Sequence, residues 1–140
     1  QPSGTLLATG SYDGIARVWT TKGEPKLTLA KHEGPIFSLQ WNKSGSYLLS
    51  GSHDMTAIVW DGETGEVRQQ TRAHSGMALD AMATSLQALI LTLMRCAVLV
   101  VRAGPILGVD WKNDTIFATC SLDRQIFVHE VGKKQPLAKF

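Results

Sequence analysis

Short runs of alternating apolar and polar residues fill most of this chain, and turn-forming residues separate them. The alternation is clearest at three apolar pairs, which are Ala16 and Val18, Ala57 and Val59, and Ile126 and Val128. Successive side chains of a β-strand point to opposite faces of its sheet, so a period of two residues predicts half-buried strands. Glycine, proline, asparagine and aspartate lie between the runs and indicate tight turns. Outside residues 77–104 the pattern predicts an all-β chain of short antiparallel strands.

Three copies of one motif organise this pattern. Each copy has a strand of small residues, an aspartate in a turn, and an apolar strand whose end residue lies six positions after the aspartate. The aspartates and their end residues are Asp13 with Trp19, Asp54 with Trp60, and Asp123 with His129. Each copy predicts a β-hairpin, and the recurrence indicates a repeat protein.

Further strands are predicted around these hairpins. The predicted strands of the first two units cover residues 6–11, 15–20, 26–29, 36–41, 47–52, 56–60 and 67–71. Four short antiparallel strands make one complete unit. Within residues 36–41, strict alternation places Phe37, Leu39 and Trp41 on one face of the sheet and Ile36 on the other.

The unit length and two residue pairs resemble a known family. Asp13 and Asp54 lie 41 positions apart, within the roughly 40 to 45 residues of a WD repeat. Trp60 is followed by aspartate, as in the Trp-Asp pair of that family, and His32 and His74 keep the histidine of its Gly-His pair without the glycine. The resemblance to WD-repeat proteins implies a β-propeller, whose blades are four-stranded antiparallel sheets.

The third unit is interrupted. Asp54 and Asp123 lie 69 positions apart, which is 28 more than one repeat. The distance from His74 to Trp111 exceeds the corresponding distance in the second unit by the same 28 positions, so one insertion is predicted at residues 77–104. The expected fold is therefore a partial WD-repeat β-propeller of about three four-stranded blades, which is incomplete. Its parts are a partial blade at 1–30, a blade at 31–72, and an interrupted blade at 73–76 and 105–140.

The insertion differs in composition from the strands around it. It is rich in Leu, Ala, Met and Val, and its apolar residues follow helical spacing from Leu79 to Met94, which predicts an apolar helix. A transmembrane span, a docking helix for a partner and a retained intron translated in frame are the alternatives. Arg95 disfavours the span, as does the need to place adjacent strands of one blade on opposite membrane faces, so no membrane partner is expected. We favour the retained intron, because codons for Gly76-Met77 and Ala103-Gly104 can contain a splice donor and a splice acceptor.

A histidine, a hydroxyl residue, an aspartate and an aromatic residue recur together. The complete set in the second unit is His32, Ser50, Asp54 and Trp60. Serine, histidine and aspartate together also form nucleophilic triads, but a catalytic set is needed once, whereas this set returns in each unit. The resemblance to WD repeats implies instead a hydrogen-bonded structural tetrad that ties the loop before a blade to its third strand. We therefore predict no enzymatic activity and no catalytic residue.

The other units carry related sets. The first unit has Thr9, Asp13 and Trp19, and the last unit has His74, Thr119, Asp123 and His129. We expect the histidine that ends the last set to donate one N–H, as tryptophan does, while it covers less apolar area.

Composition and charge exclude some other functions. The formal net charge is +2 and 44% of residues are hydrophobic, which is ordinary for a globular domain and gives no sign of disorder. Lysine and arginine are scattered, so sequence-specific nucleic-acid binding is not expected. Cys96 and Cys120 lack CxxC spacing, and the sequence predicts neither a metal site nor a cofactor.

Longer stretches resemble one branch of the WD-repeat family, the transducin-β-like nuclear corepressor subunits. These stretches lie at residues 7–19, 34–43, 64–70, 109–111 and 117–121. The resemblance implies a nuclear scaffold fragment from a transcriptional corepressor complex that contains a histone deacetylase. Its implied partners are the corepressor, the deacetylase and histone tails on chromatin. Another WD-repeat scaffold, such as a substrate receptor of a ubiquitin ligase, is the alternative.

The binding surface of a propeller is the mouth of its central channel, which turns and inner strands line. The candidate partner-binding residues there are Tyr12, Gly34, Pro35, His53, Asp110 and Leu122. The alternative for each is a turn or packing role. Because closed propellers have at least about four blades, the remaining blades of a parent chain are also expected partners.

Overall fold

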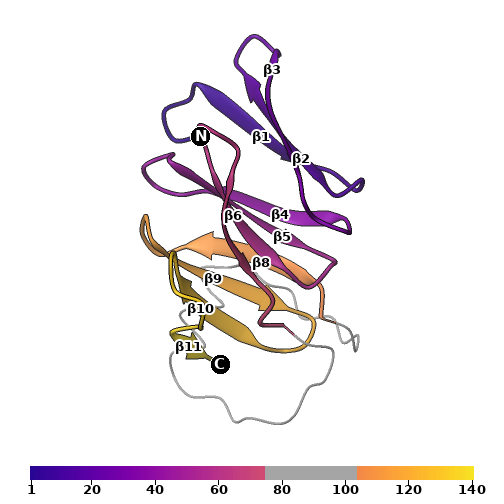
Figure 1. Ribbon diagram of the computed structural model, residues 1–140, viewed down its shortest axis with the longest axis vertical. Coiled ribbons are helices and arrows are strands. Elements are labelled where there is room, and N and C mark those ends of the chain that lie inside the picture. The colour runs from indigo at the N-terminus through magenta and orange to yellow at the C-terminus, as the bar shows by residue number, and fades with distance from the viewer. Residues whose placement is uncertain (75–103) are drawn as a thin grey trace.

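The computed structural model describes residues 1–74 and 104–140, which form three antiparallel β-sheets stacked one after another (Figure 1). The first sheet has the order β1-β2-β3, with strands Leu6–Gly10, Ile15–Thr20 and Pro25–Ala30. The second has the order β4-β5-β6-β7, with strands Ile36–Trp41, Tyr47–Ser52, Ala57–Asp61 and Val67–Thr71. The third has the order β8-β9-β10-β11, with strands Ile106–Trp111, Ile116–Ser121, Ile126–Glu130 and Ala138–Lys139.

These sheets confirm the all-β prediction for the residues that the structure describes. The strands from β1 to β7 lie where the alternation of apolar residues predicts them, within one or two residues at each end. The predicted insertion, with its helix, lies outside the described residues except for Gly104. The described residues contain no helix that could cross a bilayer.

The turn after each aspartate has the same geometry in all three sheets. The aspartate carboxylate accepts the backbone N–H two residues later, at 2.9 Å for Asp13, 2.8 Å for Asp54 and 2.9 Å for Asp123. The residue between them has a positive φ, and it is a glycine only in the first copy. Met55 and Arg124 hold φ values of 67° and 65°, a conformation that costs a side chain roughly 1–2 kcal/mol. The aspartate hydrogen bond therefore stabilises a strained turn.

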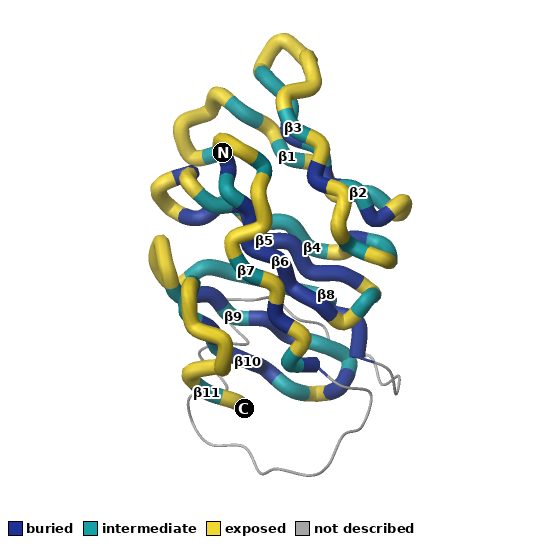
Figure 2. Tube along the Cα trace, viewed as in Figure 1, coloured by how far each residue is buried: buried dark blue, intermediate teal, exposed yellow. Residues whose placement is uncertain are grey.

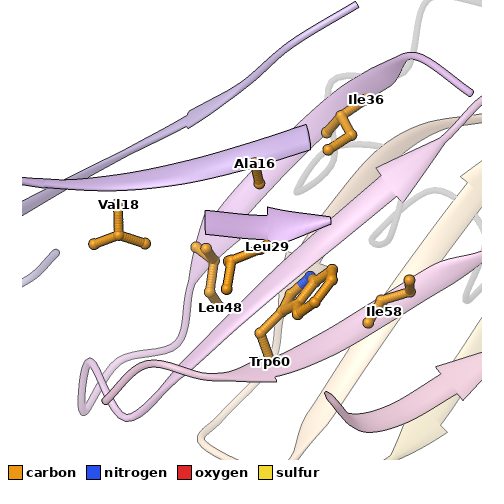
Figure 3. Packing of buried hydrophobic residues seen from close by; sticks show 7 residues of the cluster. All are labelled: Ala16, Val18, Leu29, Ile36, Leu48, Ile58 and Trp60. Carbon is orange, nitrogen blue, oxygen red and sulfur yellow. The ribbon is translucent and has the colours of Figure 1, made fainter. Parts of the chain in front are cut away.

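Hydrophobic side chains fill the space between neighbouring sheets. Between the first two sheets the buried side chains are Ala16, Val18, Leu29, Ile36, Leu48, Ile58 and Trp60 (Figure 3). Between the second and third sheets they are Leu49, Ala57, Val59, Ile106, Val109 and Phe117. Burial of each larger aliphatic or aromatic side chain contributes about 1.5–3 kcal/mol. The second sheet is covered on both faces, and its strands β5 and β6 are the most buried part of the chain (Figure 2).

Two glycines allow the sheets to approach closely. A Cβ on Gly10 would lie 2.7 Å from Cγ2 of Ile36, and a Cβ on Gly51 would lie 2.7 Å from Cγ2 of Ile106. Both glycines occupy the same position in their hairpins, and both isoleucines begin the inner strand of the next sheet. The same packing step is therefore repeated along the chain.

A β-bulge corrects the prediction for the strand at 36–41. The pairing register of β4 with β5 shifts between Ile36 and Ser38. The shift buries Ile36, and Leu39 and Trp41 pack against the same cluster. Phe37 is instead 41% exposed. The prediction that Phe37 shares a face with Leu39 and Trp41 is wrong, because the extra residue of a bulge interrupts the alternation of side chains.

Candidate functional site

The four polar residues of the second sheet form one hydrogen-bonded chain. The indole Nε1 of Trp60 donates to Ser50 Oγ at 2.8 Å, and Ser50 Oγ lies 2.7 Å from His32 Nε2. His32 Nδ1 lies 2.8 Å from Asp54 Oδ2. A neutral imidazole satisfies every partner if Nδ1–H donates to the carboxylate and Nε2 accepts the serine proton. We call this set the quartet.

Burial and charge favour that protonation state. Burial lowers the pKa of His32, although the Asp54 carboxylate opposes this shift. Burial alone would raise the pKa of Asp54, but hydrogen bonds from Thr56, the Glu33 backbone N–H and His32 outweigh it and lower the pKa. At neutral pH the pair is therefore a neutral imidazole on an ionised carboxylate.

The quartet connects the loop at 31–35 to the hairpin of β5 and β6, and its geometry does not suit attack on a substrate. Ser50 is fully buried, and its oxygen already accepts the indole proton. A cavity of about 460 Å³ nearby is lined by Lys31, Glu33, Asp54, Gln70 and Arg72, and it does not reach the serine. Since a nucleophile must touch the atom it attacks, the arrangement can hold the loop at 31–35 against the hairpin but cannot present Ser50 to a ligand.

The third sheet repeats most of this arrangement. His74 Nδ1 lies 2.9 Å from Asp123 Oδ2, and His74 Nε2 lies 2.8 Å from Thr119 Oγ1. The side chains of His74 and Asp123 are both almost fully buried. His74 therefore contacts the hairpin that follows the predicted insertion, at the position where His32 contacts its own hairpin.

His129 does not complete the third set. It is 1% exposed, and both of its ring nitrogens are buried without a hydrogen-bond partner in the described structure. Its ring stacks on Phe117 at a centroid distance of 5.2 Å. The expectation that His129 replaces the tryptophan donor is wrong, because the shorter imidazole packs on Phe117 and forms no bond to Thr119. Burial, with a smaller contribution from His74, lowers the pKa of His129 to about 4.

The first sheet carries only part of the set. Trp19 Nε1 donates to Thr9 Oγ1 at 2.9 Å. Asp13 accepts the Ile15 N–H and pairs with Arg17 at 3.0 Å, and these two contacts lower its pKa. No histidine among the described residues reaches either Thr9 or Asp13, and both are exposed.

Three of the exposed side chains form an aromatic row at one end of the first two sheets. Tyr12 is 81% exposed and contacts Phe37 edge to face at 6.3 Å. Phe37 contacts the exposed His53 in the same way at 6.1 Å. We call these residues the aromatic row. Tyr12 and His53 are predicted site residues, whereas Phe37 is missed because its strand is bulged.

A signal for the missed residue exists in the third unit. Gly108 lies inside β8 at the position that Ser38 occupies in β4, and β8 is bulged between Ile106 and Gly108. Glycine inside a strand often marks a bulge. The same bulge in the second unit separates Phe37 from Leu39.

The other predicted mouth residues have backbone roles. The Gly34 carbonyl accepts Ser52 Oγ at 2.9 Å, and the Pro35 carbonyl accepts the His53 N–H at 2.9 Å. The Leu122 N–H donates to the Pro105 carbonyl at 3.3 Å. Asp110 Oδ1 accepts the neighbouring backbone N–H of Trp111 at 2.8 Å. Gly34 and Pro35 therefore join the Asp54 turn to the loop that enters β4, beside the aromatic row, and Leu122 makes the corresponding contact in the third sheet.

Comparison with known proteins shows which family this chain resembles. The family "WD domain, G-beta repeat" matches residues 1–20 and 23–61. The chain is 44% identical over 137 residues to F-box-like/WD repeat-containing protein TBL1X of Mus musculus, covering 98% of this chain. The chain belongs to the WD-repeat family. It is also 45% identical over 137 residues, again 98% of its length, to WD40 repeat-containing protein HOS15 of Arabidopsis thaliana.

The fold agrees with solved WD-repeat structures. The β-propeller domain of Myceliophteria thermophila Cps50 (Swd1) matches with a TM-score of 0.72 at 20% identity. That match covers 100% of this chain and 36% of the other. Each sheet described above is therefore a WD-repeat blade, which confirms the prediction of a partial β-propeller. The chain spans 21% of TBL1X and 18% of HOS15, about a fifth of either relative.

Proposed function

We propose that this chain is part of a non-catalytic protein-interaction scaffold, a WD-repeat subunit of a nuclear transcriptional corepressor complex that contains a histone deacetylase. The observation that carries the proposal is the exposed aromatic row on a frame whose quartet is internally satisfied. The 44% identity to TBL1X over nearly the whole chain supports the corepressor assignment. The partners we propose are the corepressor, the deacetylase and histone tails.

The non-catalytic part of the proposal rests on the quartet. Its serine is buried, its histidine is held between two partners, and its aspartate accepts four hydrogen bonds that support the local turn. All of these contacts join residues of this blade and of the loop that enters it. A catalytic group, in contrast, must keep at least one polar atom available for the reacting molecule.

The binding part rests on the aromatic row. Tyr12 and Phe37 expose large ring surfaces to solvent. Aromatic side chains supply much of the affinity at protein interfaces because they bury a large area with few rotatable bonds. The turns below the row are held by backbone hydrogen bonds, so the row loses little further freedom when a partner binds.

The test uses the full-length protein that contains this chain, with variants F37A and Y12A. Each should weaken binding to purified corepressor by roughly tenfold or more, since interface aromatics often contribute over about 1.4 kcal/mol. V67A, which truncates another exposed apolar residue on β7, is the matched control. Unchanged affinity in both aromatic variants would contradict this binding surface. Recovery of a cullin adaptor in place of the deacetylase would contradict the corepressor assignment.

A further inference from the structure

We propose that a charged cavity beside the outer strands of the first two sheets is a second binding site, which takes a peptide segment with one acidic and one basic side chain close together. The cavity has a volume of about 460 Å³ and is lined by Lys31, Glu33, Asp54, Gln70 and Arg72. None of the three residues of the aromatic row lines it. The inference does not depend on the corepressor assignment.

Two cations follow corresponding strands of neighbouring sheets. β3 and β7 are edge strands of the first and second sheets. Lys31 comes directly after β3, and Arg72 comes directly after β7. Both side chains line the same cavity. Two cations that face one cavity can bind a single carboxylate between them, through charge-assisted hydrogen bonds.

Four of the lining side chains are available for a ligand. Lys31, Glu33, Gln70 and Arg72 are all exposed. Their side chains form no hydrogen bond or ion pair with any residue that the structure describes. A ligand that pairs with them therefore breaks no existing contact, and only the ordering of the side chains opposes binding.

Asp54 differs from these four because its oxygens are already occupied. Oδ2 accepts hydrogen bonds from His32 at 2.8 Å and from the Glu33 N–H at 3.0 Å. Oδ1 accepts the N–H and the hydroxyl of Thr56 at 2.8 Å and 2.6 Å. Glu33 is therefore the carboxylate of the cavity that can still pair with a cation.

The balance of charge decides the class of ligand. The lining holds two cations and two carboxylates, so its formal charge is zero and a polyanion gains little long-range attraction from it. An acidic side chain would pair with Lys31 and Arg72, and a neighbouring basic side chain would pair with Glu33. The Gln70 carboxamide carries both donors and an acceptor, which suits a peptide backbone. The volume lies within the usual range of ligand pockets.

The test measures peptide binding to the full-length protein that contains this chain, by saturation-transfer NMR, which detects weak binding to a large protein. The probes are four eight-residue peptides of glycine and serine whose two central positions hold Glu-Lys, Gln-Lys, Glu-Gln or Glu-Glu. The Glu-Lys peptide should bind roughly threefold more tightly than each of the others, because only this peptide satisfies both charges. About 1 M salt should remove the preference, since exposed ion pairs are screened.

Charge reversals locate the preference in the cavity. K31E and R72E should each weaken binding of the Glu-Lys peptide by roughly threefold. K22E makes the same change at an exposed lysine that does not line the cavity, and it should leave the affinity unchanged. E33K should shift the preference toward the Glu-Glu peptide. The proposal is overturned if the unmodified protein binds all four peptides equally or binds the Glu-Glu peptide most tightly, or if K31E and K22E have equal effects.

Discussion

The second and third blades contain the same hydrogen-bonded histidine, aspartate and hydroxyl residue but differ at the fourth residue of the set. In both, a histidine bridges an aspartate and a hydroxyl at 2.7–2.9 Å. Trp60 joins this network in the second blade, whereas His129 lies beside it without a hydrogen bond in the third. The turn keeps nearly the same φ in both blades, 67° at Met55 and 65° at Arg124. The histidine and aspartate are therefore sufficient for the turn, and the indole adds burial and one bond.

The largest effect should come from removing the aspartate. D54A would leave the His32 ring, the Glu33 N–H and the Thr56 N–H without their acceptor. We expect a loss of about 3 kcal/mol in the free energy of unfolding, because the buried donors of His32 and Thr56 lose their charged partner. D13A removes the equivalent aspartate from the exposed first blade, where the loss should be smaller than in the second blade. Equal losses in chemical denaturation would contradict the bracing role.

Exchanging the fourth residue should have the next largest effect. W60H makes the second blade resemble the third and removes a buried aromatic side chain with its N–H bond to Ser50. The expected loss is about 2–3 kcal/mol, below the usual cost of a full truncation to alanine. The fold of the turn should persist, as it does at Arg124. Thermal unfolding checks the first statement, and amide exchange at Met55 checks the second.

The unpartnered histidine predicts a pH dependence of the third blade. The pKa of His129 is lowered to about 4 from 6.5, so the unfolded chain binds more protons between these values. Stability is then fully present above about pH 6.5 and falls as the pH drops toward 4, by up to about 1.4 kcal/mol per pH unit. H129F removes this group while it keeps an aromatic ring.

The control for that prediction is the second blade. Burial also lowers the pKa of His32, so a weaker dependence should remain in H129F. The measurement is the denaturation midpoint at pH 7 and at pH 5, for the unmodified chain and for H129F. An H129F protein that is as sensitive to acid as the unmodified chain would show that His129 is not the responsible group.

The smallest expected effect is a gain. H129W restores the tryptophan that occupies this position in the other two blades, and the added indole N–H is placed to donate to Thr119. We expect a stabilisation of about 1 kcal/mol, the typical net value of one hydrogen bond. A loss of stability would show that packing around Phe117 has closed on the smaller ring.

The strands and the repeat could be predicted from the sequence because each blade uses an alternating pattern and a turn with a defined aspartate. Two side-chain assignments could not. Phe37 is the extra residue of a bulge, and the residues of its own strand do not reveal the bulge, because it depends on how neighbouring strands pair. The only signal lies in the third unit, at Gly108. His129 carries a polar ring at the position of Trp60, but a hydrogen bond also requires that a ring nitrogen reach Thr119. The packing of the ring on Phe117 decides this distance.

Trp41 could not be predicted from its own unit either. Its indole Nε1 is buried without an acceptor among the described residues, whereas Trp111 Nε1 donates to the Gln40 carbonyl. The indole of Trp41 occupies the position of Trp111, and a repeat alone predicts the same partner for both. The partner, however, lies on the preceding sheet, which has no inner strand among the described residues. A buried tryptophan at a repeat boundary therefore reports on the neighbouring blade as much as on its own.

A double-mutant cycle on S50A and W60F tests the central claim most directly, since W60F keeps the aromatic packing and removes only the indole donor. If the quartet braces the blade, each variant lowers the free energy of unfolding, and the two losses couple by about 1 kcal/mol. Losses that add within about 0.3 kcal/mol would contradict the claim that these residues act as one hydrogen-bonded unit.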